Sequence, residues 1–237
     1  MDKHAVVTNE EWVTARKGLL AAEKEFTRAR DQLSQRRRDL PWAPVEKEYV
    51  LEGEAGAKTL SDLFDGRPQL IVYHFMFDPD WDAGCKSCSF WADNFDPIIV
   101  HLNARDVTMV AISRAPLDKL LAYRARMGWS FDWFSSFGND FNFDYGVSFT
   151  PEELEDGGAP SYNYGSLAAN VPEREGVSVF YKDLDGRLFH TYSAYARGID
   201  MVNTAYHYLD LVPQGRNETP GSSQSWVRRH DEYGERL

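Results

Sequence analysis

The stretch Leu70-Ile-Val-Tyr-His-Phe-Met-Phe77, followed by Gly84-Cys-Lys-Ser-Cys88, decides the fold of this chain. Eight apolar and aromatic residues in a row, bounded by Pro68 and by Asp78-Pro79, are typical of a central strand that is covered on both faces. The cysteine pair comes after this strand and opens a helix that we expect to reach about residue 103. The segment therefore predicts a strand, a cysteine pair and a helix in succession.

The segments that follow extend this unit. Residues 107–113 are predicted as a second buried strand and residues 117–127 as a helix, so the order β-α-β-α implies parallel strands. Residues 129–149 suggest another strand and an aromatic loop, and residues 157–170 are rich in turn residues. Residues 176–182 and 187–193 form an antiparallel hairpin around Asp183-Leu-Asp-Gly186, and a last helix covers about 198–211. We expect an α/β fold with a central mixed sheet flanked by helices.

The start of the chain predicts one long helix, from Thr8 to about Arg38. We expect three regions: a helix and connector at 1–44, a compact domain at 45–212 and a polar extension at 213–237, part of which docks through Trp226. Along the helix, large residues alternate with alanine at intervals of three and four. This seam could pack on its own domain or pair with a second subunit, giving a homodimer; its members are Trp12, Ala15, Leu19, Ala22, Phe26, Ala29 and Leu33.

The amino-acid composition argues against several classes of function and partner. The 237 residues are 43% hydrophobic and 14% aromatic, enough for a packed interior. With 37 acidic and 26 basic residues, the formal charge of −11 would repel phosphate backbones and anionic lipids, so we expect neither nucleic acid nor a membrane as partner. No apolar run approaches the roughly eighteen residues that span a bilayer, and the N-terminus has no apolar signal-peptide core. We expect a cytoplasmic protein.

The two cysteines carry the clearest chemical signal. At the start of a helix, unpaired backbone N–H groups and the positive end of the dipole favour a thiolate at Cys85, and the spacing brings Cys88 within disulfide reach. Cys85 could then attack a disulfide, and Cys88 could resolve the mixed disulfide that forms. The same C-x-x-C motif is also half of a zinc site, so metal ligation remains an alternative.

Three histidines are candidate partners of the thiols. His74 lies within the first strand, where alternation places it with Leu70 and Val72 as a hydrogen-bonded core histidine, unless its face meets the cysteine helix. His101 falls at the far end of the cysteine helix, so we interpret it as structural. His190 lies on the second strand of the hairpin, which makes it the best distal partner for Cys85.

The motifs taken together resemble the domain-of-unknown-function 899 family, from about Trp12 to the terminal Arg229-His-Asp-Glu-Tyr233. The resemblance implies a thioredoxin-like fold and a dithiol-disulfide oxidoreductase, and Tyr145-Gly-Val147 resembles the peroxiredoxin branch. The motifs that carry the resemblance are Tyr73-His-Phe-Met-Phe77, Gly84-Cys-Lys-Ser-Cys-Ser-Phe90, His101-Leu-Asn-Ala-Arg-Asp106, Ser113-Arg-Ala-Pro116, Met127-Gly-Trp129, Phe141-Asn-Phe-Asp-Tyr-Gly-Val147, Phe189-His-Thr-Tyr-Ser193, Ala196-Arg-Gly198, Leu209-Asp-Leu211 and Gly215-Arg216.

The chain departs from ordinary thioredoxins around the cysteines. Gly84 and Ser87 stand where those proteins carry Trp and Pro, and Glu175-Gly-Val-Ser178 replaces the cis-proline segment before the hairpin. Asp82 stands where peroxiredoxins carry Thr or Ser, which disfavours their route to peroxide reduction. Without the cis-proline a metal could enter, and Cys85, Cys88 and His190 would suit Cu(I) or Zn(II).

Our leading interpretation is a thiol-disulfide oxidoreductase that acts on a small-molecule or protein disulfide with Cys85 as nucleophile and Cys88 as resolving thiol, and that requires no cofactor. The alternative is a copper- or zinc-binding thioredoxin-like protein, either a metal carrier or a metal-dependent oxidoreductase. A third class is a non-catalytic interaction module built around the N-terminal helix seam.

Overall fold

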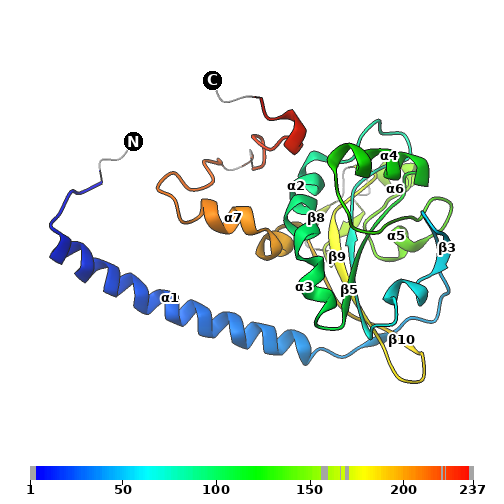
Figure 1. Cartoon of the computed structure of the whole chain (residues 1–237), viewed down its shortest axis with the longest axis horizontal. Helices are drawn as coiled ribbons and strands as arrows, with labels where there is room; N and C mark the ends of the chain where they lie inside the picture. Colours follow the sequence, from blue (N-terminus) through cyan, green and yellow to red (C-terminus); the bar gives the residue numbers. More distant parts are fainter. Residues whose placement is uncertain are drawn as a thin grey trace. The chain divides into compact units, whose positions relative to one another are not determined.

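A computed structural model describes residues 4–155, 160–165, 167–168, 171–219, 221 and 223–234 of the protein. Part of the turn-rich segment expected at 157–170 lies outside the described residues. The chain divides into two compact units, Met1–Pro41 and Trp42–Leu237 (Figure 1).

The first unit is the helix α1 (Asn9–Arg38). It begins with a capping box, in which the Thr8 side chain accepts the N–H of Glu11 and the Glu11 carboxylate accepts the N–H of Thr8. Arg36, Arg37 and Arg38 occupy the last turn, where positive charge interacts favourably with the helix dipole. The predicted long helix is confirmed almost to the residue, because these residues mark both of its ends. None of its residues is buried.

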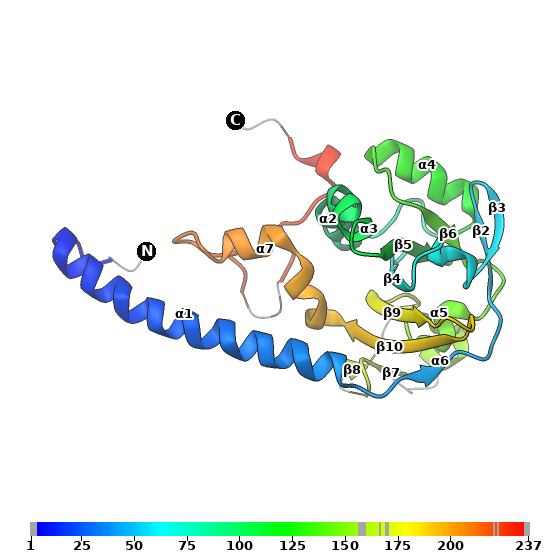
Figure 2. The ribbon, with the colours of Figure 1, turned by 60° about the horizontal axis from the view of Figure 1, so that its bottom comes forward.

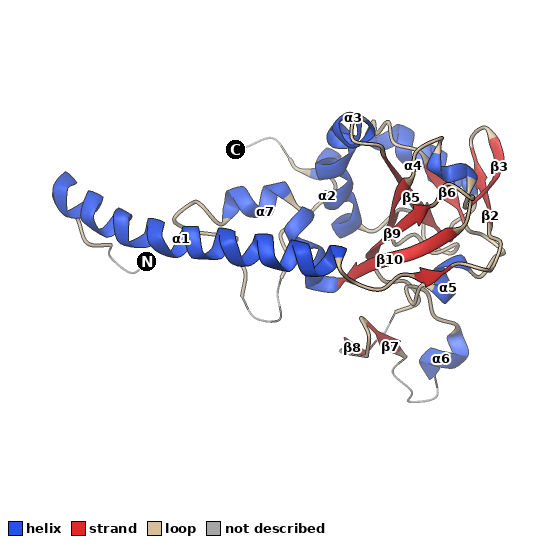
Figure 3. Ribbon diagram, turned by 90° about the horizontal axis from the view of Figure 1, so that it is seen from below, coloured by secondary structure: helices blue, strands red, loops and turns tan. Residues whose placement is uncertain are grey.

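The second unit is built on an eight-stranded sheet with the order β1-β10-β9-β4-β5-β6-β2-β3 (Figure 3). A separate two-stranded sheet pairs β7 (Ser161–Tyr162) with β8 (Leu167–Ala168). The strands of the large sheet are β1 (Ala43–Pro44), β2 (Val50–Gly53), β3 (Gly56–Thr59), β4 (Gln69–His74), β5 (Val107–Ser113), β6 (Trp133–Ser135), β9 (Gly176–Lys182) and β10 (Leu188–Tyr195).

Four central strands define the fold class. β4 and β5 are parallel, β9 is antiparallel to β4, and β10 is antiparallel to β9. The β4–β5 connection carries the cysteine helix, and β9 and β10 are the expected hairpin. This arrangement of a β-α-β unit followed by an antiparallel hairpin is the thioredoxin-like fold, as the sequence predicted.

Helices cover both faces of the sheet (Figure 2). Alternation along β4 sends Tyr73 to one face, where it packs with residues of α2 and α4, and Leu70 and Val72 to the other, where they pack with Phe141 of α5. We call these the α2 face and the α5 face. The helices of this unit are α2 (Lys86–Phe95), α3 (Ile99–Asn103), α4 (Leu117–Met127), α5 (Phe141–Asp144), α6 (Pro151–Glu155) and α7 (Thr204–Leu209), with short 3-10 helices η1 (Asp62–Phe64), η2 (Asp96–Ile98), η3 (Ala196–Val202) and η4 (His230–Glu232).

Two predicted helices are divided in the structure. The cysteine helix, expected to run to residue 103, is broken into α2, η2 and α3 at Pro97, which has no N–H to continue the hydrogen-bond ladder. The helix expected at 198–211 is split into η3 and α7, because Asn203 adopts an extended conformation and its side chain caps α7 by accepting the N–H of Tyr206.

The C-terminal segment after α7 returns to α2. The Trp226 ring lies 5.5 Å from Phe90 of that helix, centroid to centroid, and Val227 is fully buried. The predicted docking through Trp226 is therefore confirmed. Among the described residues, no helix combines the length and the apolar character needed to cross a lipid bilayer.

Candidate functional site: a cysteine pair at the start of α2

Cys85 and Cys88 lie where the loop after β4 enters α2. Cys85 is the N-cap residue of α2, and its backbone N–H donates to the carbonyl of Met76 at 3.1 Å. The N–H of Met76 in turn points at the Cys88 sulfur at 3.4 Å. Both cysteines are thus held against the same residue of the chain that leaves the central strand.

The two thiols are electrostatically unequal. A hydrogen bond from the Cys88 thiol lowers the pKa of Cys85 to about 7, and the N–H groups of Cys88 and Ser87 act in the same direction, although burial opposes them. Burial raises the pKa of Cys88 well above its ordinary value. Cys85 is partly exposed, whereas Cys88 is 1% exposed. The pair therefore has one accessible thiol close to ionisation at neutral pH and one buried, protonated thiol.

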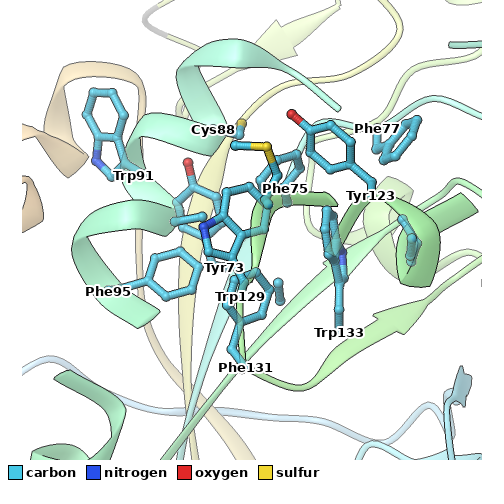
Figure 4. Packing of buried hydrophobic residues seen from close by; sticks show 14 of the residues in the cluster. Tyr73, Phe75, Phe77, Cys88, Trp91, Phe95, Tyr123, Trp129, Phe131 and Trp133 are labelled. Atoms are coloured by element: carbon cyan, nitrogen blue, oxygen red, sulfur yellow. The ribbon is translucent and has the colours of Figure 1, made fainter. Parts of the chain in front are cut away.

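A cavity of about 320 Å³ opens beside this pair. Both cysteines line it, together with Tyr73 and Glu175. Cys88 also belongs to the aromatic cluster of the α2 face, which Figure 4 shows with Tyr73 and Phe75. A small molecule in this cavity would meet sulfur, a carboxylate and aromatic rings.

His190 is not brought to the cysteines, contrary to the sequence expectation. Its ring packs against Phe180 and Tyr145 on the α5 face, with centroids 5.5 and 5.4 Å away, and its Nε2 lies 2.7 Å from the Ser193 hydroxyl. The sheet lies between His190 and Cys85, and strand β9 separates β10 from β4. The order of the strands along the chain does not determine on which face of the sheet the His190 ring lies.

His74 is the buried core histidine that alternation indicated. Its Nε2 lies 2.8 Å from the Ser178 hydroxyl on the α5 face, and burial lowers the pKa of His74 to about 3. His74 is therefore neutral at physiological pH and does not reach the thiols.

The donor set expected for copper or zinc does not fit this geometry. Cys85 and Cys88 lie on the α2 face and His190 on the α5 face, so the three cannot bind one ion. Over the part of the chain that the structure describes, no three His, Cys, Asp or Glu side chains are grouped to hold a metal ion.

The family model described as "Bacterial protein of unknown function (DUF899)" matches residues 1–233. The chain belongs to the DUF899 family. No curated protein matches its sequence.

Several solved structures are similar to this DUF899 protein. Peroxidoxin BcpB from Mycobacterium tuberculosis is 13% identical, with a TM-score of 0.46 over 70% of this chain and 94% of that one. Peroxiredoxin Q from Xanthomonas campestris is 12% identical, with a TM-score of 0.47 over 70% and 96%. A putative protein disulfide isomerase from Bacteroides thetaiotaomicron is 16% identical, with a TM-score of 0.40 over 71% and 91%.

One feature of the DUF899 chain near the cysteines was not anticipated from its sequence. Arg114, at the end of β5, donates from Nη2 to Asp78 at 2.8 Å and from Nε to Glu173 at 2.5 Å. Asp78 begins the loop that leads to Cys85, and Glu173 precedes β9. Arg114 therefore ties the loop after β4 to the segment before β9, but the three residues are too far apart in sequence to give a local signal.

The packing around residue 84 explains why this chain has glycine where ordinary thioredoxins have tryptophan. A Cβ atom at this position would lie 2.7 Å from the Phe75 ring and 2.8 Å from the Tyr123 ring. The loop before Cys85 packs so closely on the α2 face that no side chain fits where thioredoxins carry tryptophan.

Proposed function

We propose that this DUF899 protein is a thiol-disulfide oxidoreductase in which Cys85 attacks a disulfide and Cys88 resolves the intermediate. The observation that carries this proposal is the inequality of the two thiols at the start of α2. A partly exposed thiol with a pKa of about 7 is a competent nucleophile, and a buried neighbouring thiol is protected from direct reaction with the substrate.

The reaction consists of two exchanges. In the first, the Cys85 thiolate attacks one sulfur of the substrate disulfide, a mixed disulfide forms, and one substrate thiolate leaves. In the second, Cys88 attacks the sulfur of Cys85, the intramolecular disulfide forms, and the second substrate thiolate leaves. The substrate gains two electrons, the cysteine pair loses two, and an external thiol or dithiol reductant restores the pair. No cofactor is needed.

The size of the cavity favours a low-molecular-weight disulfide as substrate. Its volume of about 320 Å³ suits a small molecule, and Ser223 and Gln224 of the C-terminal segment line it together with Arg197 of η3. Glu175 also occupies the place where thioredoxins present the cis-proline edge to an extended peptide.

A stoichiometric reaction with the chromogenic disulfide dithiobis(nitrobenzoate) tests the proposal. The reduced protein should release two equivalents of the coloured thiolate in two phases, one for each exchange. Cys88→Ser should release one equivalent and retain the other as a stable adduct, whereas Cys85→Ser should react slowly. Release of a single equivalent by the unmodified protein, or rapid reaction of Cys85→Ser, would overturn the assignment.

A further inference from the structure

Glu175 lies on the same face of the sheet as the cysteine pair. In the pairing of β4 with β9, the last partners are His74 and Gly176, so Glu175 comes one residue beyond that pair. Val177 packs against the cluster of the α2 face, and alternation gives residue 175 the same direction. The Glu175 side chain therefore points toward the cavity, which it lines together with Cys85 and Cys88.

The backbone around Glu175 is anchored. The Tyr162 hydroxyl donates to the Glu175 carbonyl at 2.6 Å. Two residues earlier, Glu173 is buried against Arg114, and two residues later, Val177 is paired with Tyr73 of β4. The backbone that carries the Glu175 side chain at the cavity wall is therefore held in place on both sides.

A carboxylate in this position works against thiolate formation. Burial is the main reason that the pKa of Cys88 is raised, and the negative charge of Glu175 adds to it; at Cys85, Glu175 opposes the hydrogen bond that lowers the pKa. The same charge contributes to the raised pKa values of Tyr73 and Tyr162, both of which are raised chiefly by burial. The charge of Glu175 therefore does not activate Cys85 as the nucleophile.

We propose that Glu175 is the catalytic base that takes the proton from Cys88 during the second exchange, an inference that rests on the proposed function. As the Cys88 sulfur bonds to the Cys85 sulfur, its proton passes to the Glu175 carboxylate. The bond between Cys85 and the substrate sulfur breaks, and its electron pair leaves on that sulfur. Protonated Glu175 then returns the proton to the departing thiolate, which restores the carboxylate.

The other charged groups around the cavity have different roles. Arg197 forms an ion pair with Asp200 at 3.2 Å, and Asp200 also binds Arg216 at 3.1 Å. Arg174 packs over the Tyr162 ring. Among these cavity groups, Glu175 is the carboxylate whose charge acts on both thiols.

The isosteric variant Glu175→Gln separates this role from a purely electrostatic one. With stoichiometric dithiobis(nitrobenzoate) at pH 6, the first phase should be as fast as in the unmodified protein or faster, because the opposing charge is gone. The second phase should slow by about a hundredfold, in the range of general-base contributions. Glu175→Asp should restore part of the rate, and exposed Glu48→Gln should leave both phases unchanged.

The outcomes distinguish the two proposals. If the unmodified protein shows no second phase, the dithiol function itself fails. If the second phase is present and Glu175→Gln retains its full rate across pH 6 to 8, then Glu175 is not the proton acceptor, although the dithiol function stands.

The helix α1 supports a second, independent inference. Trp12, Leu19, Phe26 and Leu33 recur every seven residues, the heptad spacing of a coiled-coil seam, and they are 45–69% exposed. Ala15, Ala22 and Ala29 each lie three residues after one of these large residues, and they form the second position of the seam. In this heptad assignment, Glu25 and Arg30 occupy positions that flank the seam.

The charges beside the seam fit a second copy of the same helix. In a parallel, in-register pair, each flanking residue faces the residue five positions later on the other helix. Glu25 then faces Arg30 of the partner subunit, and the other flanking pairs bring no like charges together: Glu11 with Arg16, Gly18 with Glu23 and Gln32 with Arg37. The seam ends after Leu33, because Arg36 takes the place of a fourth alanine. We infer that α1 forms a parallel homodimeric coiled coil.

Sedimentation of full-chain variants in which the charges at residues 25 and 30 are exchanged tests whether two α1 helices pair. Glu25→Arg and Arg30→Glu should each weaken dimerisation about tenfold, because like charges then face one another on both sides of the seam. The double variant should restore the dimer, and Lys24→Glu, away from the seam, should leave it unchanged. A monomeric full chain at tens of micromolar, or a double variant that stays weakened, would overturn the inference.

Discussion

The Arg229 guanidinium donates a hydrogen bond of 2.8 Å from Nη2 to the carbonyl oxygen of Gly84, the residue immediately before Cys85. Its Nε also donates to the Tyr123 hydroxyl at 2.8 Å. Arg229 thus holds the loop that leads into Cys85, more than a hundred residues away in sequence. The C-terminal segment is therefore part of the construction of the site.

Gly84→Ala tests how tightly this loop is packed. Because the added methyl group would overlap the rings of Phe75 and Tyr123, we expect a loss of about 1–3 kcal/mol in the free energy of unfolding, measured with urea. Gly18→Ala is the matched control. It adds the same group to α1, where nothing lies within 4 Å, and should stabilise the helix slightly. Equal changes in the free energy of unfolding for Gly84→Ala and Gly18→Ala would contradict the close packing around Gly84.

Arg114→Ala tests the ion cluster that Arg114 forms with Asp78 and Glu173. The substitution leaves the Glu173 carboxylate, which is 1% exposed, without its cationic partner. We expect a loss of about 3–5 kcal/mol at pH 8. Adding Glu173→Gln should recover part of the loss, since it removes the more deeply buried of the two carboxylates that Arg114 pairs with, while Asp78, which is 7% exposed, still lacks its cation. If the double variant is as unstable as Arg114→Ala, the cost does not come from the uncompensated carboxylate.

The same carboxylate makes stability depend on pH. Burial raises the pKa of Glu173 to about 7 from an ordinary value of 4.5. Between these values the folded protein binds more protons than the unfolded chain, so stability falls as pH rises, at up to about 1.4 kcal/mol per pH unit, and levels off above pH 7. Urea titrations from pH 4.5 to 8 should show this slope, and Glu173→Gln should flatten it. An unchanged slope in that variant would assign the pH dependence to other groups.

Much of the fold could be predicted because its signals are local. The apolar run at 70–77, the cap at Thr8 and the turn at Asp183-Leu-Asp-Gly186 each specify their own element. The thioredoxin-like order of strands followed from these elements and from the resemblance to the family.

The site was predicted less completely because part of it is not local. The position of Cys85 at a helix start could be predicted from the sequence, and the structure places Cys85 at the N-cap of α2. The face occupied by His190 depends on strand direction and on an irregularity in β10 between His190 and Tyr192, which the sequence does not mark. The contact of Arg114 with Glu173 joins residues 59 positions apart and depends on the completed sheet.

Alkylation of the reduced protein as a function of pH, read residue by residue by mass spectrometry, directly tests whether the two thiols are unequal. Cys85 should react with a midpoint near pH 7 while Cys88 stays unmodified in the folded protein. In Cys88→Ala the Cys85 midpoint should move upward, because the hydrogen bond from the Cys88 thiol is lost, whereas His190→Ala should leave it in place. Equal alkylation of both cysteines with midpoints above pH 8.5 would contradict the account.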